Sequence, residues 1–240
     1  MALIEDITEL KRLENIRTEF AANVSHELKT PLTSIRGFVE TLQDGVADPE
    51  QEQRFLHIIA SETERLSRLI SDILYLSELE STPETAASQL VDMYDCALMT
   101  VELLRSRAEE KQLQLHLEND PSGQAFCLGS EDKMKQMLVN IIANAIAYTP
   151  EGGRIDVRLY SDEKNAYVSV KDTGIGIPKE AIPRLFERFY RVDKGRSRAM
   201  GGTGLGLAIV KHIALAMQGD ITVHSKVGKG SEFIIRVPKA

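Results

Sequence analysis

The sequence lacks several features that mark common classes of protein. It has only two cysteines, Cys96 and Cys127, too few for a disulfide framework or a zinc site. No apolar run approaches the ~20 residues that a membrane-spanning helix needs. Residues 1–6 turn acidic too early for a signal peptide. There is no internal repeat and no low-complexity tract. We therefore expect a soluble chain from a reducing compartment, or a soluble piece of a longer protein.

Positive charge is also in deficit. Lys and Arg number 29 against 36 Asp and Glu, which gives a formal net charge of −7. This balance argues against a nucleic-acid-binding surface, which is usually basic. The hydrophobic share of 42% excludes wholesale disorder, and 240 residues suffice for one or two domains.

The first third of the chain has a helical pattern. Apolar residues recur over residues 10–42 at a spacing between the coiled-coil period of 3.5 and the free-helix period of 3.6. Helix breakers follow at 44–49, and a second helical pattern covers 55–76 with Glu62 as a polar intruder. We predict an antiparallel helical hairpin over 1–80. It would dimerise into a four-helix bundle, because two helices alone bury too little. A dimeric coiled-coil spacer fits the same pattern.

Residues 81–87 are predicted to form a linker, since the segment after Ser81 is short and polar and contains Pro83. Helical and strand-like stretches alternate beyond it. The expected helices cover about 88–110, 131–147 and 205–218; the expected strands are 113–117, 155–159, 167–170, 221–223 and 233–237. This mixture predicts an α/β sandwich over 88–240.

Glycine is clustered in three places, at 174–176, 201–206 and 228–230. The second cluster opens a predicted helix, where glycines let backbone N–H groups approach a phosphate and the helix dipole favours the anion. No Walker lysine follows the cluster, and no βαβ unit surrounds it, so neither of those nucleotide motifs applies. Each cluster taken alone is also compatible with an ordinary tight turn.

Three further features of this second region suggest nucleotide chemistry. Asp172 precedes the first glycine cluster, where it would accept an exocyclic amine such as that of adenine, or merely cap the turn. Asn140 and Asn144 share one face of an apolar helix and need partners. Mg²⁺ held with nucleotide phosphates would supply one, and a hydrogen bond to a neighbouring loop is the alternative. The basic segment 184–198 is either a lid over a polyphosphate or a solvated loop.

His26 lies between core positions of the first helical pattern, so we expect it to face solvent. Glu27 would hold one ring proton and leave the other nitrogen nucleophilic, although adjacent helical residues do not face each other directly. Thr30, one turn further on, lies over the same face and would position a water. Pro31 implies a tolerated kink. An ordinary surface histidine is the alternative.

These motifs, in this order, resemble those of sensor histidine kinases of two-component signalling, most of all the PhoR/WalK-like group. The segment SHELKTPL resembles the H box and VNIIANAIAYTP the N box. DTGIGI, FERFYR, GGTGLGLAI and GKGSEF resemble the first glycine box, the F box, and the second and third glycine boxes. The resemblance covers about residues 10–238. It implies a dimeric helical hairpin followed by a Bergerat-type α/β sandwich that binds ATP and Mg²⁺.

The resemblance implies a role for each matching residue. His26 would be the phosphoacceptor, Glu27 its base or orienting group, and Thr30 an aid to dephosphorylation of the partner. Arg191 would steer the γ-phosphate, and Asn144 would hold Mg²⁺. The implied nucleotide-binding set is Asn140, Asn144, Tyr148, Asp172, Gly174, Gly176, Lys194, Gly202, Thr203, Gly204, Leu205 and Gly206.

One position departs from the family pattern. The N box often carries Lys where this chain has Ala147, so a phosphate contact is either missing or supplied by the lid. Residues 4–10 resemble the end of a PAS-type sensor domain, which makes 1–9 a remnant of an upstream sensor. We therefore expect the cytoplasmic part of a membrane receptor whose sensor and transmembrane segments lie upstream.

The implied partner is the receiver domain of a response regulator, which would dock near His26 and take the phosphoryl group on an aspartate. Phosphatase activity towards the phosphorylated regulator is expected beside the kinase activity. Three alternatives stay open: a phosphatase-dominant protein, an ATPase of the chaperone or topoisomerase kind, and a catalytically dead scaffold. The H box speaks against the second, and Ala147 alone supports the third.

Overall fold

The computed structural model describes residues 8–45, 48–81, 89–118, 125–193, 195 and 202–240. The chain divides into two compact units. The first contains residues 1–71 and 201–203, and the second contains 72–200 and 204–240. None of the helices in the described ranges has the length and apolar character needed to cross a bilayer.

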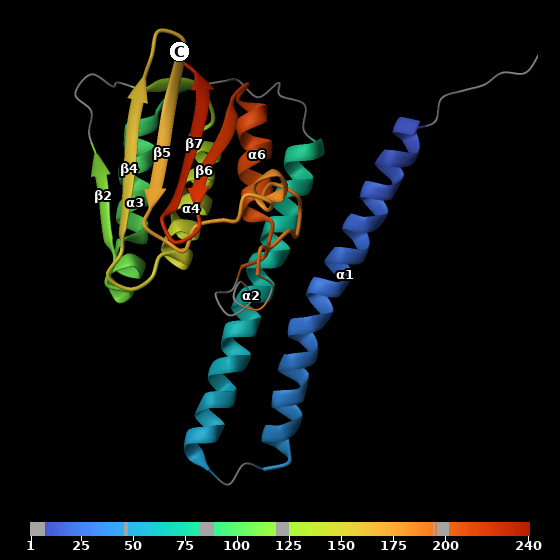
Figure 1. Ribbon diagram of the computed structural model, residues 1–240. Coiled ribbons are helices and arrows are strands. Elements are labelled where there is room, and N and C mark those ends of the chain that lie inside the picture. The colour runs from blue at the N-terminus through green and yellow to red at the C-terminus, as the bar shows by residue number, and fades with distance from the viewer. Residues whose placement is uncertain (1–7, 46–47, 82–88, 119–124, 194, 196–201) are drawn as a thin grey trace, which may run out of the picture. The chain divides into compact units, whose positions relative to one another are not determined.

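The first unit contains the long helix α1 (Thr8–Gln43) and most of a second one, α2 (Pro49–Ser81), whose last residues belong to the second unit (Figure 1). Pro49 suits the first position of α2, because the N–H that it lacks would have no partner there. The Asp48 carboxylate accepts the N–H of Glu50 at 3.0 Å, which satisfies another amide of the first turn. The rings of Phe38 and Phe55 lie 5.0 Å apart and join the two helices. The predicted helical hairpin is confirmed.

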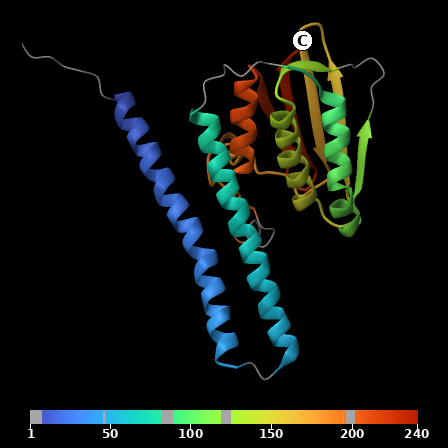
Figure 2. The ribbon, with the colours of Figure 1, turned by 180° about the vertical axis from the view of Figure 1, so that it is seen from behind.

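The second unit is an α/β sandwich. Its five-stranded sheet has the order β2-β4-β5-β7-β6; β2 and β4 are parallel, and the other neighbours are antiparallel. Helices α3, α4 and α6 cover one face of the sheet (Figure 2). The bounds are α3 Met93–Glu110, β2 Gln114–Glu118, α4 Glu131–Tyr148, β4 Arg154–Ser161, β5 Asn165–Asp172, α6 Gly206–Ala216, β6 Asp220–Lys226 and β7 Gly230–Pro238, with a 3-10 turn at Ile182–Arg184. The predicted fold class is confirmed.

Helix α4 lies at the centre of the helical layer and packs against both α3 and α6. Its apolar residues are spaced for one buried face, and Met137, Leu138 and Ile142 are fully enclosed. The central strand β5 buries alternate residues towards this layer, as its sequence alternation requires. The core therefore fixes α4 and the end of β5, from which the candidate site is built.

The start of the second region differs from the prediction of a helix beginning near residue 88. Residues Gln89–Asp92 form a strand, β1, which pairs antiparallel with β3 (Phe126–Gly129). Helix α3 begins only at Met93, because the Asp92 carboxylate accepts the N–H groups of Tyr94 and Asp95 and caps it. Four residues are too few for sequence periodicity to distinguish a strand from a helical turn.

Several sequence predictions fall outside the described residues. They are the upstream remnant at 1–7, most of the linker at 82–88, and positions 194, 196–201 and 46–47. The predicted domain limits of 1–80 and 88–240 remain predictions.

Truncation of the α4 core should destabilise the second unit. Leu138 is completely buried, so Leu138→Ala should lower the free energy of unfolding by about 2–5 kcal/mol. The matched change Leu103→Ala on α3, where the side chain is 68% exposed, should cost no more than about 0.5 kcal/mol. Urea unfolding of both variants measures the difference, and equal losses would contradict this placement of the core.

Candidate functional site

The carboxylate of Asp172 is held at the end of the central strand. Its Oδ1 accepts the backbone N–H of Gly174 at 2.7 Å and that of Ser231 at 3.2 Å, and the residue is 6% exposed. Burial raises its pKa above the usual 3.8, while the two N–H donors act in the opposite direction. A buried, oriented acceptor of this kind suits an exocyclic amine.

The first glycine cluster is pressed against the end of α4. A Cβ on Gly174 would lie 2.6 Å from Asp172 Oδ1 and 2.7 Å from the carbonyl oxygen of Tyr148. That same carbonyl accepts the N–H of Ile175 at 3.2 Å. Position 174 therefore has room only for glycine, and the contact brings Tyr148 beside Asp172.

The third glycine cluster closes over the first one. Gly176 has a positive φ of 70°, and a Cβ there would lie 2.2 Å from the carbonyl oxygen of Lys226. The N–H of Gly228 donates to the carbonyl of Ile175 at 2.8 Å. The turn between β6 and β7 thus fixes the loop that follows Asp172.

Asn140 connects α4 with the beginning of α6. A Cβ on Gly206 would lie 3.4 Å from Asn140 Oδ1. The Asn140 amide nitrogen is buried and has no hydrogen-bond acceptor among the residues that the structure describes. A buried donor without an acceptor is costly, and a ligand oxygen would remove that cost. The position of Asn140, beside the N-terminus of α6, therefore fits an anionic ligand such as a phosphate.

The F box is joined to the second glycine cluster. The N–H of Phe189 donates to the carbonyl of Gly204 at 2.8 Å, and Gly204 has a positive φ of 77°. A Cβ on Gly204 would lie 3.2 Å from Arg191 Nε. The structure thus brings together Arg191, Gly204 and the buried Leu205, which precedes α6.

The remaining predicted residues are placed less fully. Asn144 is half-buried one helical turn after Asn140 on α4. Lys194 lies outside the described residues, and Gly202 and Thr203 are grouped with the first unit. Within the described ranges, no group of three His, Cys, Asp or Glu side chains could hold a metal ion.

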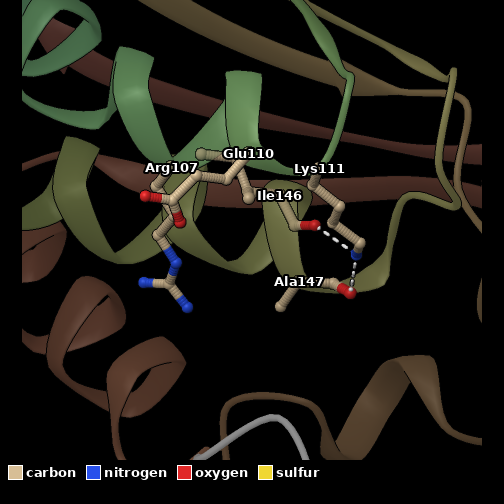
Figure 3. Close-up of a pocket in the computed structure, with 5 residues that line it drawn as sticks. All are labelled: Arg107, Glu110, Lys111, Ile146 and Ala147. Carbon is tan, nitrogen blue, oxygen red and sulfur yellow. Dashed lines mark hydrogen bonds between the residues drawn. The ribbon is translucent and has the colours of Figure 1, made fainter.

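Lys111 lies beside Ala147. Lys111 was not singled out from the sequence. From the end of α3 its Nζ donates to the carbonyl oxygens of Ile146 at 2.8 Å and Ala147 at 2.7 Å (Figure 3). Burial, with a smaller effect of Arg107, lowers the pKa of Lys111 below 10.5. Together with Glu110, these residues line a pocket of about 330 Å³. Lys111 is therefore engaged in capping the C-terminus of α4.

A cluster of charged side chains connects the end of α2 with α6 within the second unit. Glu80 forms an ion pair with Arg188 of the F box, and its Oε1 lies 3.7 Å from His212 Nε2. Burial lowers the pKa of His212 below 6.5; Glu80 opposes this change and Arg188 adds to it. The imidazole thus resists protonation in the folded unit.

On α1, His26 is exposed as predicted, and Glu27 is half-buried beside it. The Thr30 hydroxyl donates to the backbone carbonyl of His26 at 3.1 Å, so it is engaged within the helix; its expected role towards a water remains a prediction. Glu27 Oε2 accepts from Arg65 Nη2 of α2 at 3.0 Å. Arg65 was missed in the sequence, although it stands at core spacing, four residues before the buried Leu69.

Two family models match the chain at these two regions. Residues 16–82 match the His Kinase A (phospho-acceptor) domain, and residues 129–240 match the Histidine kinase-, DNA gyrase B-, and HSP90-like ATPase. The fold and site therefore define an ATP-binding ATPase domain that follows a helical phospho-acceptor domain. The chain belongs to the sensor histidine kinases.

Known sensor histidine kinases are similar to almost the whole length of the chain. The chain is 40% identical over 241 residues to the sensor histidine kinase WalK of Bacillus subtilis, covering 99% of this chain and 39% of that protein. It is 40% identical over 235 residues to the phosphate regulon sensor protein PhoR of Pseudomonas aeruginosa, covering 97% and 52%. The predicted similarity to PhoR and WalK is confirmed. The chain spans about half or less of these relatives.

A solved structure resembles the whole chain. Histidine kinase ThkA, in complex with the response regulator protein TrrA, superimposes with a TM-score of 0.76 at 26% identity. The match covers 99% of this chain and 69% of that one.

A methyl group at position 174 should displace the Asp172 carboxylate. We expect Gly174→Ala to weaken binding of an ATP analogue at least about tenfold, because the lost contact includes a charge-assisted hydrogen bond. Gly37→Ala, where a Cβ would meet open space, should leave the affinity unchanged. Calorimetric titration measures both, and equal affinities in the two variants would contradict the assigned role of Asp172.

The stability of the second unit should fall in mild acid. Because the pKa of His212 is lowered from 6.5, the unfolded chain binds the proton more readily, and stability is lost as pH falls below about 6.5. His212→Gln should reduce the loss in Tm between pH 7.5 and 5.5, whereas His224→Gln, at an exposed site, should not. Thermal unfolding at both pH values gives the comparison; an unchanged loss in His212→Gln would refute the assignment.

Proposed function

We propose that the chain is the catalytic core of a sensor histidine kinase. It transfers the γ-phosphoryl group of ATP to His26 and then to an aspartate of a response regulator. The observation that carries this proposal is the exposed imidazole of His26 beside an anchored carboxylate, in a chain that also has the ATPase domain of this family.

The nucleotide would be bound by groups that converge on α4, β5 and α6. Asp172 accepts the amine of adenine, and Gly174 and Gly176 let the base approach. The Asn140 amide nitrogen, which has no acceptor within the described ranges, donates to a phosphate oxygen near the N-terminus of α6. The rest of the binding set comprises Tyr148, Lys194, Gly202, Thr203, Gly204, Leu205 and Gly206.

Asn144 is the residue proposed to hold Mg²⁺. Its carboxamide oxygen is a suitable hard ligand, and Mg²⁺ normally takes few protein ligands and completes its shell with phosphates and water. When bound, the ion neutralises charge on the phosphates. Arg191, which lies beside Gly204, would neutralise further charge and direct the γ-phosphate towards His26.

His26 is the nucleophile of the first step. A lone pair on one ring nitrogen forms the new N–P bond as the bond from the γ-phosphorus to the β,γ-bridging oxygen breaks and ADP leaves with that electron pair. Glu27 accepts a hydrogen bond from the other nitrogen's N–H and stabilises the positive charge that the ring acquires. In the second step a regulator aspartate attacks the same phosphorus and restores the free imidazole. In the phosphatase reaction Thr30 would position a water that attacks the phosphorus of the regulator's aspartyl phosphate, so that the bond from phosphorus to the aspartate oxygen breaks and inorganic phosphate leaves.

The hairpin is the proposed surface for both protein partners. Leu32, Val39, Leu56 and Ile70 remain exposed on α1 and α2 in the single chain, and a second copy would cover such residues in a four-helix bundle. The receiver domain of a response regulator would dock near His26; the similar histidine kinase ThkA forms a complex with the response regulator protein TrrA. We also propose that the chain is the cytoplasmic part of a membrane receptor with a PAS-like sensor upstream.

Incubation with γ-labelled ATP and Mg²⁺ tests the function directly. Wild type should take up label that is stable in base and labile in acid, as a phosphohistidine is. His26→Gln should take up none. Asn140→Ala should reduce ATP affinity by about tenfold, because a ligand hydrogen bond to a charged group is lost.

The outcomes separate the alternatives. Steady ATP hydrolysis without labelled protein would favour an ATPase of the chaperone or topoisomerase kind. ATP binding with neither label nor hydrolysis would favour a phosphatase-dominant protein or a scaffold. Loss of phosphate from a phosphorylated regulator would then favour the phosphatase, and its retention would favour the scaffold.

A further inference from the structure

Arg65 is a charged residue enclosed in the apolar interior of the hairpin. It is 4% exposed, whereas Arg68, three residues further along α2, is exposed. Arg65 precedes the buried Leu69 by one helical turn, so its side chain points into the seam between α1 and α2. A guanidinium in such a place is costly unless carboxylates pair with it.

Two carboxylates meet this guanidinium. Nη1 donates to Glu62 Oε2 at 3.2 Å within α2, and Nη2 donates to Glu27 Oε2 at 3.0 Å on α1. The side chain of Glu27 is only 15% exposed, so the pair is shielded from solvent. Glu62 thus holds the guanidinium from α2, the helix that also carries Arg65, while Nη2 of the guanidinium contacts Glu27 on α1.

The local backbone explains why Glu27 needs a tertiary restraint. Pro31 has no N–H, so the helical bond that would join residue 31 to the carbonyl of Glu27 cannot form. On either side of Pro31, the hydroxyls of Thr30 and Thr33 donate to the carbonyls of His26 and Lys29, a pattern that bends helices. The backbone carbonyl of Glu27 thus lacks its usual helical partner, and the contact with Arg65 restrains the Glu27 side chain from the other helix.

We propose that Arg65 is a positioning residue for phosphoryl transfer to His26 and that it acts through Glu27. It fixes one carboxylate oxygen against α2 and so sets the direction from which the carboxylate serves the neighbouring imidazole. The inference rests on the proposed function, because it assigns Arg65 a part in that reaction. An apolar side chain would fill the seam at lower electrostatic cost, so the pair is better explained by orientation of Glu27 than by stability.

A double-mutant cycle on the whole chain tests the proposal. Arg65→Met should lower the single-turnover rate of His26 labelling at least about tenfold, since a displaced general base loses much of its effect. The KM for ATP should change less than about twofold, because Arg65 lies in the hairpin, whereas Asn140, which is proposed to bind phosphate, and Asp172, which is proposed to bind adenine, lie in the other unit. Arg68→Met is the matched control and should label at the wild-type rate.

The coupling to Glu27 distinguishes positioning from support of the fold. If Arg65 acts through Glu27, Glu27→Gln with Arg65→Met should be no slower than Glu27→Gln alone. Arg65→Lys should recover part of the rate, because it keeps the charge but not the two-pronged geometry. If Arg65→Met fails to fold by circular dichroism, the same cycle with Arg65→Lys decides.

The experiment distinguishes failure of the proposed function from failure of the inference about Arg65. Wild type that takes no label overturns the proposed function and this inference together. Labelled wild type with an equally fast Arg65→Met overturns the inference alone. Losses that add fully in the double variant, or a changed KM with an unchanged rate, also overturn it, because the effect of Arg65 would then not pass through Glu27.

Discussion

The ATP-binding unit depends on one buried carboxylate. Asp172 ends the central strand, and its Oδ1 receives the N–H groups of Gly174 and Ser231. Gly174 belongs to the first glycine cluster, and Ser231 directly follows the third at the start of β7, far away in the sequence. Because the acceptor is buried, both segments must approach it to compensate for its desolvation. The site is therefore organised around an acceptor that β5 holds in place.

The glycines follow from this constraint. The loops approach so closely that a Cβ at 174 would collide with Asp172 Oδ1 and one at 176 with the carbonyl of Lys226. Asn140 on α4 shows the opposite condition, a buried donor with no acceptor in the described part of the chain. One polar group is thus satisfied by the fold, and the other has no partner within the described residues, which supports the proposed contact with a phosphate.

Part of this arrangement was predictable from the chain. The helical period predicted that His26 faces solvent, and it does, because a long amphipathic helix leaves little choice of buried face. Periodicity failed at Gln89–Asp92, since a four-residue strand is defined by its partner β3 and not by its own pattern. Lys111 was also missed, because its contacts with Ile146 and Ala147 join residues that are 35 and 36 positions apart in the sequence.

The sequence by itself determined the hairpin, the α/β class and the residue types of the site, because periodicity and ordered motifs are local properties of the chain. Tertiary structure decided which of those residues meet. The pairing of Arg65 with Glu27 requires two helices in register, and the closure of Ser231 on Asp172 requires adjacent strands. Contacts of this kind arise from packing between segments distant in sequence, where burial makes each polar group dependent on one particular partner.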